Sequence, residues 1–146
     1  MTQPTLQISC SINTTDPLAQ LGLEIRLDNQ VVFDLEHVTK LVEFKHSISD
    51  VDADRCLEFV IKNKTTEHTK IDEQGNIISD ACLTISNLEF DEIELKQIFV
   101  DKAIYTHDFN GTQPEIQDKF YGAMGCNGTV SLKFSTPMYL WLLENM

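Results

Sequence analysis

The alternation of apolar and polar residues along the chain limits its possible folds more than any other feature. From Leu6 to Ile12, apolar side chains alternate with Gln7, Ser9 and Ser11. A period of two is the pattern of a strand with one buried face, because successive side chains of a strand point to opposite sides. The segment therefore predicts a first strand.

The same period recurs through much of the sequence. Turn-forming pairs separate the alternating segments, at Asp28-Asn29, Asn110-Gly111 and Asn127-Gly128, and each pair predicts a hairpin-type turn. About nine to eleven strands at this spacing are typical of a sandwich or barrel. The pattern predicts an all-β fold, namely a two-sheet antiparallel β-sandwich of jelly-roll-like type, in a single domain over residues 1–146.

Two stretches depart from the simple pattern. Residues 63–75 are polar and are expected to form a loop, and the apolar residues between Leu88 and Val100 are irregularly spaced. A tight turn at Asp91 and Glu92 with one or two short strands fits the second stretch better than a helix does, since no apolar stripe of period 3.6 runs through it.

The segment from Met138 to Leu143 is apolar in both phases. Interpreted as a last strand, it requires burial on both sides, whereas a sandwich strand has one inner face. Tyr139, Trp141 and Leu143 would then share a face that a loop, a subunit or a ligand must cover. Such aromatic residues can stack on a sugar or anchor a protein interface, and the accompanying aliphatic residues favour the interface.

The charge balance limits the partners of the chain. Twenty-three acidic and eleven basic residues give a net charge of -12, which repels phosphate backbones and anionic lipids. We therefore expect no nucleic-acid partner and, without an apolar run of about 18 residues, no membrane partner. The four cysteines are scattered without a Cys-x-x-Cys pair, so we expect reduced thiols and no zinc site.

No short catalytic signature occurs in the sequence. A nucleophile elbow, a phosphate loop, a dinucleotide glycine pattern and a His-Glu-x-x-His helix are all missing. A site assembled across strands would leave no local trace. We nevertheless expect a protein that is not an enzyme.

Two acidic groups are candidate metal ligands, with calcium as the cofactor that suits carboxylate oxygens. Asp50, Asp52 and Asp54 resemble the opening of a calcium loop, but Arg55 and Ile61 stand where an EF-hand needs glycine and glutamate. A solvated acidic loop is the favoured interpretation. The second group consists of Glu67, Asp72 and Asp80, with His68 and Glu73 nearby.

The C-terminal third resembles small uncharacterised structural proteins of marine T4-like cyanophages. The resemblance runs from Asp101 to Met146 and is carried by YTHDFNG, KFYGAMGCNGTV and TPMYLWLLENM. It implies a component of the virion, such as a capsid decoration or tail-associated protein that is made in the host cytoplasm and acts through contacts between subunits. A homo-oligomer is the state that this role implies.

The middle of the chain resembles calcium-dependent carbohydrate-binding modules. The resemblance covers Leu21 to Leu95 and lies in LEIRLDNQVVFDL, CLEFVIKNKTTEHTKID and DACLTISNLEF. It implies a jelly-roll-like sandwich and glycan recognition, but no calcium motif can be matched residue by residue. The sequence thus predicts a phage structural protein, with a calcium-dependent carbohydrate-binding module as the alternative.

Overall fold

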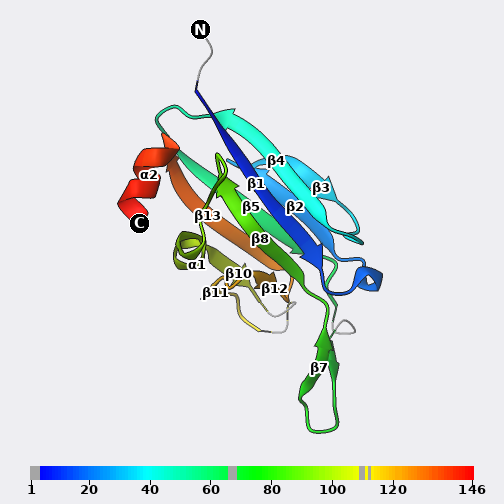
Figure 1. The fold of residues 1–146 in the computed structure, drawn as a ribbon. Coiled ribbons are helices and arrows are strands. Elements are labelled where there is room, and N and C mark those ends of the chain that lie inside the picture. Colours follow the sequence, from blue (N-terminus) through cyan, green and yellow to red (C-terminus); the bar gives the residue numbers. More distant parts are fainter. Residues whose placement is uncertain (1–3, 66–68, 109–110, 112) are drawn as a thin grey trace.

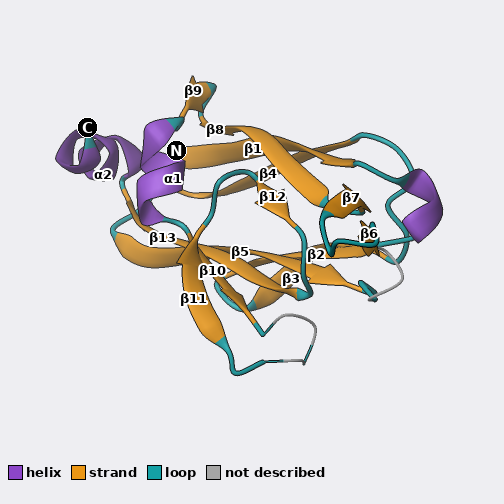
Figure 2. Ribbon diagram, turned by 90° about the horizontal axis from the view of Figure 1, so that it is seen from below, coloured by secondary structure: helices purple, strands orange, loops and turns teal. Residues whose placement is uncertain are grey.

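The structure is a computed structural model that describes residues 4–65, 69–108, 111 and 113–146. It is a jelly-roll-like sandwich of two antiparallel sheets, as the alternation predicts (Figures 1 and 2). The first sheet has the order β12-β8-β1-β4, with β9 paired to β8, and the second has the order β11-β10-β13-β5-β2-β3.

The strands of the first sheet are β1 (Thr5–Thr14), β4 (Val42–Ser49), β8 (Leu83–Phe90), β9 (Ile93–Glu94) and β12 (Ala123–Met124). Those of the second are β2 (Gly22–Leu27), β3 (Gln30–Leu35), β5 (Ala53–Lys62), β10 (Ile104–His107), β11 (Ile116–Lys119) and β13 (Gly128–Thr136). β6 (Thr69–Ile71) and β7 (Ile77–Asp80) form a separate hairpin that extends from one end of the sandwich (Figure 1).

The core lies between the two sheets and contains the apolar phase of each predicted strand. Leu6, Ile8 and Ile12 of β1 face Leu57, Phe59 and Ile61 of β5 across this core, and all six are almost completely buried. Burial of a side chain of this size stabilises the fold by about 1.5–3 kcal/mol. The period-two pattern therefore predicted the inner faces correctly.

Two of the predicted turns have the expected form. Asp28 and Asn29 join β2 to β3 with φ values of 51° and 67°, and Asp91 and Glu92 join β8 to β9 with φ values of 51° and 68°. Two consecutive positive φ values define the hairpin turn that matches strand twist. The Asn110-Gly111 pair lies partly outside the described residues.

The Asn127-Gly128 pair does not form a hairpin, and that prediction was wrong. Asn127 lies between β12 of the first sheet and β13 of the second, and Gly128 is the first residue of β13, so the chain crosses here from one sheet to the other. Gly128 is required for another reason. A Cβ atom at this position would lie 2.3 Å from the carbonyl oxygen of Thr106 on the neighbouring strand β10.

The polar stretch at 63–75 and the irregular stretch after Leu88 contain elements that the sequence pattern did not predict. The hairpin strand β6 lies in the first, and the helix α1 (Gln97–Lys102) follows β9 in the second. With these and the short strands β9, β11 and β12, thirteen strands occur among the described residues, more than expected. A three-residue 3-10 helix, Pro17–Ala19, connects β1 to β2.

The predicted last strand is a helix, α2 (Met138–Asn145), so that interpretation was wrong. A short apolar run does not distinguish a buried strand from a buried helix by periodicity. Leucine, methionine and glutamate favour a helix, and Pro137 stands at its N-terminal boundary. None of the helices in the described part of the chain has the length and apolarity needed to cross a membrane.

Candidate functional site

The helix α2 separates the residues that were predicted to form one platform. Trp141 is 7% exposed, and its ring centroid lies 5.9 Å from that of Phe90 and 6.0 Å from that of Phe134. Tyr139 is 58% exposed, and Leu143 also faces solvent. The shared face expected for Tyr139 and Trp141 does not exist, because two residues along a helix differ in direction by about 200°.

The acidic loop of Asp50, Asp52 and Asp54 does not converge on one point. Asp50 Oδ1 accepts a hydrogen bond of 2.9 Å from the backbone N–H of Met138, whereas Asp52 is exposed. Asp54 lies in β5 opposite Ser135 of β13. Among the described residues, no three His, Cys, Asp or Glu side chains are close enough to hold a metal ion.

The second acidic group is also dispersed. Glu67 and His68 lie outside the described residues. Asp72 accepts hydrogen bonds of 2.9 Å from the backbone N–H groups of Gln74 and Asn76, and these bonds lower the pKa of its carboxyl group. Asp72 thus stabilises the β6–β7 turn, while Asp80 lies at the other end of that hairpin.

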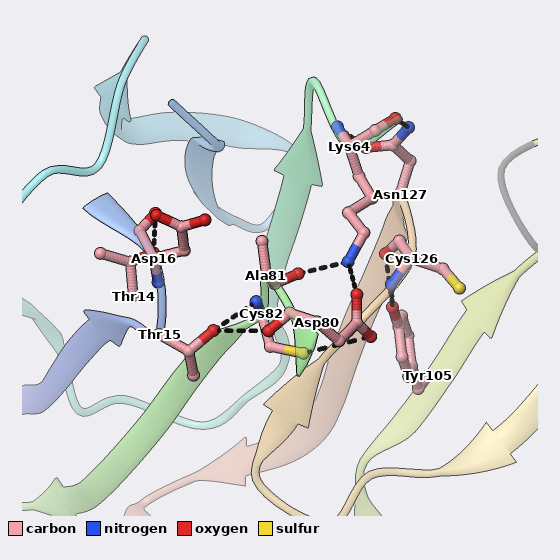
Figure 3. A network of polar contacts seen from close by, with 10 residues as sticks. All are labelled: Thr14, Thr15, Asp16, Lys64, Asp80, Ala81, Cys82, Tyr105, Cys126 and Asn127. Atoms are coloured by element: carbon pink, nitrogen blue, oxygen red, sulfur yellow. Dashed lines mark hydrogen bonds and ion pairs between the residues drawn. The ribbon is translucent and has the colours of Figure 1, made fainter. Parts of the chain in front are cut away.

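Asp80 belongs to a polar network at the base of the hairpin (Figure 3). The Lys64 side chain is fully buried, and its ammonium group donates to Asp80 Oδ1 and to the carbonyl oxygen of Ala81. Asn127 exchanges two hydrogen bonds of 2.8 Å with the backbone of Lys64. Asp80, one of the predicted calcium ligands, is thus paired with a buried ammonium group.

The same network joins both sheets. Thr15 Oγ1 donates to the carbonyl oxygen of Asp80 and accepts from the backbone N–H of Cys82 at 2.8 Å. The hydroxyl of Tyr105 donates to the carbonyl oxygen of Cys126 and accepts from its N–H at 2.9 Å. Burial raises the pKa of Tyr105 and of both cysteines, so these groups are neutral at pH 7. The network holds loops together and offers no ionised nucleophile.

An open groove of about 820 Å³ lies on the second sheet. Its lining comes from the β2–β3 turn, the start of β5, the end of β13 and α2: Asp28, Asn29, Asp54, Arg55, Cys56, Lys133, Phe134, Ser135 and Trp141. This volume falls within the range of about 300–1,000 Å³ that ligand sites occupy. We call it the sheet groove.

Strand register explains which side chains face the sheet groove. Lys133 pairs with Cys56 and Ser135 pairs with Asp54, so these four point to the same, outer face of the sheet. Phe134 between them is buried in the core. The alternation that predicted the core therefore also predicts these outward side chains, but it does not bring them together with the β2–β3 turn.

The electrostatics of the sheet groove combine a fixed ion pair with free polar groups. Arg55 Nη1 lies 2.9 Å from Asp28 Oδ2, and Asp28 Oδ1 accepts from the backbone N–H of Cys56 at 2.9 Å. Asp54 and Lys133 are exposed and form no ion pair with any described residue. Burial raises the pKa of Cys56, with a further contribution from Glu58. The groove offers carboxylate, amide, hydroxyl and ammonium groups to a polar ligand.

The described part of the chain belongs to the class of two-sheet antiparallel β-sandwiches with an open groove on one sheet. No protein-family model matches the chain, and no curated protein matches it. A similar solved structure is the selenomethionine form of vCBM60, from a study of two families of calcium-dependent carbohydrate-binding modules. The two chains are 9% identical, with a TM-score of 0.55 over 87% of this chain and 89% of that one.

A second similar structure is vCBM60 in complex with galactobiose. It is 10% identical, with a TM-score of 0.48 over 86% of this chain and 96% of the other. A TM-score below 0.5 is too low to indicate a common fold. The first structure supports a common fold, which agrees with the fold implied by the sequence resemblance to carbohydrate-binding modules.

Proposed function

We propose that this chain is a non-enzymatic module that binds a glycan in the sheet groove. The observation that carries the proposal is the lining of the groove, where Asn29, Asp54 and Ser135 present hydrogen-bonding groups on an open surface. Sugar hydroxyl groups both donate and accept, so they match carboxylate, amide and hydroxyl partners. A groove open along the surface suits a chain of sugars.

Further features of the groove fit the same ligand. The Asp28–Arg55 ion pair fixes the β2–β3 turn against β5, so this side of the groove is formed before a ligand arrives. Trp141 also lines the groove, although its side chain is largely buried. The shared fold with a calcium-dependent carbohydrate-binding module gives the proposal additional support.

The alternative is that glycan binding depends on calcium as a cofactor. Asp50 caps α2, Asp52 is exposed, Asp54 lines the sheet groove, and Asp80 is paired with Lys64. We therefore propose that glycan binding in the sheet groove proceeds without calcium. A chelator separates the two alternatives, because a calcium-dependent module loses binding when the ion is removed.

A glycan array probed with the labelled protein tests the proposal, once with calcium and once with EDTA. We expect at least one glycan to bind equally in both conditions, and Asp54→Ala to weaken that binding by about tenfold, the equivalent of one good hydrogen bond to a charged group. The matched control is Asp52→Ala, which removes the same charge outside the groove. Absence of binding to every glycan in both conditions would overturn the proposal.

A second candidate function is a subunit contact within a virion, made through α2. Tyr139, Leu140 and Leu143 are exposed large apolar residues on this helix, and Met146 is exposed at its C-terminal cap. Leu143 follows Tyr139 at spacing i, i+4 and Leu140 at spacing i, i+3, so the three side chains lie on one side of α2. Apolar stripes of this kind dock into grooves of partner proteins.

Light scattering coupled to size-exclusion chromatography tests the second candidate, together with mass spectrometry of purified virions. The expected result is an oligomer that a Tyr139→Ser and Leu143→Ser double variant converts to a monomer. A monomer in both cases, combined with absence of the chain from virions, would contradict it. Loss of glycan binding in the double variant would instead connect α2 with the groove.

A further inference from the structure

We propose that the chain has a second binding site, on the first sheet, which takes a single neutral pyranose ring. The site is a cavity of about 230 Å³ between β8, α1 and the residues that precede β12. Its lining shares no residue with the sheet groove. This inference rests on the proposed function, because the second site would bind the same class of ligand, a glycan.

The floor of this cavity is apolar and rigid. Phe99 of α1 and Phe120 are buried, and their ring centroids lie 5.5 Å apart. Ile85 and Leu88 of β8 complete the floor. Next to it, Tyr121 is 77% exposed, which is unusual for an aromatic side chain beside a cavity. Its ring is available to stack on a ligand.

The rim of the cavity is lined by polar side chains. Ser86, Asn87, Glu94 and Lys96 line it, and all four are exposed. Their side chains form no hydrogen bond or ion pair with any described residue. Glu94 and Lys96 carry opposite charges, so the rim as a whole is close to neutral. It offers both hydrogen-bond donors and acceptors around an apolar floor.

The backbone around the cavity is held in unusual conformations. Asn87 has a φ of 55°, and Lys96 has a φ of 50° with a ψ of -116°. The register of β1 and β8 shifts between Ser9 and Ser11, which places a bulge at Asn87. Non-glycine residues in such conformations are strained and gather at ligand sites. The bulge directs Asn87 towards the cavity.

The chemistry of the lining selects the ligand class. An aliphatic peptide side chain would fill the floor but leave Asn87 and Glu94 without partners, which is unfavourable. An anion would meet Glu94 as well as Lys96, so the rim gives it no net attraction. A pyranose ring has a face of C–H groups for Tyr121 and hydroxyl groups around its edge for the rim. The volume lies below the range of about 300–1,000 Å³ for drug-sized ligands, which limits the occupant to about one ring.

An NMR titration of the ¹⁵N-labelled chain tests the inference. The probes are the methyl glycosides of glucose, galactose, mannose and xylose, followed by galactobiose. We expect at least one methyl glycoside to shift the amide signals of Asn87, Lys96 and Gly122 in a saturable way. Tyr121→Ala should weaken this binding by about fivefold or more, because the stacking contact is lost, and Tyr121→Phe should retain it.

The control is Leu18→Ala, which removes an exposed apolar side chain outside both the lining of this cavity and α2, and it should leave the titration unchanged. Three results would overturn the inference: no shift of the cavity amides with any probe, a Tyr121→Ala variant that binds normally, or an equal loss in Leu18→Ala. The amides of Asn29, Cys56 and Ser135 report on the sheet groove. If they respond while the cavity amides do not, the inference fails and the proposed function stands; if neither set responds, both fail.

Discussion

Asp50 Oδ1 accepts a 2.9 Å hydrogen bond from the backbone N–H of Met138, 88 residues away in the sequence. Met138 is the first residue of α2, and Pro137 before it provides no side-chain cap. The carboxylate of Asp50 therefore performs the role of an N-cap residue from another part of the chain. Its negative charge also lies near the positive end of the helix dipole.

Replacing this capping carboxylate should destabilise the protein. We expect Asp50→Ala to lower the free energy of unfolding by about 1 kcal/mol, the usual value of an N-cap. Urea denaturation followed by circular dichroism measures the change. Asp52→Ala is the control and should stay within about 0.5 kcal/mol of the parent, because Asp52 is exposed. Equal effects of the two substitutions would contradict the cap.

The two aromatic residues of α2 should behave differently on substitution. Trp141→Ala removes a buried ring from contact with Phe90 and Phe134, so it should cost about 3–5 kcal/mol of stability. Tyr139→Ala should cost less than about 0.5 kcal/mol, since its ring faces solvent. Thermal denaturation compares the two. Similar losses of stability in the two variants would instead favour the last strand that the sequence pattern predicted.

Removing the buried Lys64 ammonium group should strongly destabilise the protein. Lys64→Met removes the ammonium group that pairs with Asp80 and should destabilise the fold by about 3 kcal/mol. Lys45→Met, at an exposed position of β4, is the control. The double variant Lys64→Met with Asp80→Leu should recover part of the loss, because it removes the carboxylate that had lost its ammonium partner, while the carbonyl oxygen of Ala81 still lacks the Lys64 donor. A double variant as unstable as the single one would refute this explanation.

Glu24 of β2 should make stability depend on pH in the acid range. A hydrogen bond of 3.1 Å from Lys62 lowers the pKa of Glu24, and Arg26 lowers it further, while burial opposes both. Because the folded state holds the carboxylate ionised below its ordinary pKa of 4.5, the stabilisation is complete at neutral pH. It is lost as the pH falls from about 4.5 through the folded pKa.

The unfolding temperature as a function of pH tests this expectation. Glu24→Gln should be less stable than the parent at pH 7, and the difference should shrink below pH 4.5. Asp72→Asn provides a comparison from the separate hairpin, where the pKa is lowered by turn hydrogen bonds instead. A difference between Glu24→Gln and the parent that stays constant with pH would contradict the argument.

Much of the fold was predictable from local patterns, and the sites were not. The alternation at Leu57, Phe59 and Ile61 marks an inner face whichever strands lie beside it. The Asp28-Asn29 pair likewise specifies its own turn. In contrast, the sheet groove requires Asp54 and Ser135 to be neighbours, and this pairing depends on the order of the strands. No local signal could have revealed Tyr121 as the rim of a cavity.

The sequence by itself determined the sandwich, because side-chain direction in a strand depends only on neighbouring residues. The tertiary structure decided the conformation of the C-terminal segment, where an apolar run fits a strand or a helix equally and packing against Phe90 and Phe134 selects the helix. It also decided that Asp80 pairs with Lys64. Such partnerships depend on which loops meet in space, a property that emerges only when the whole chain has folded.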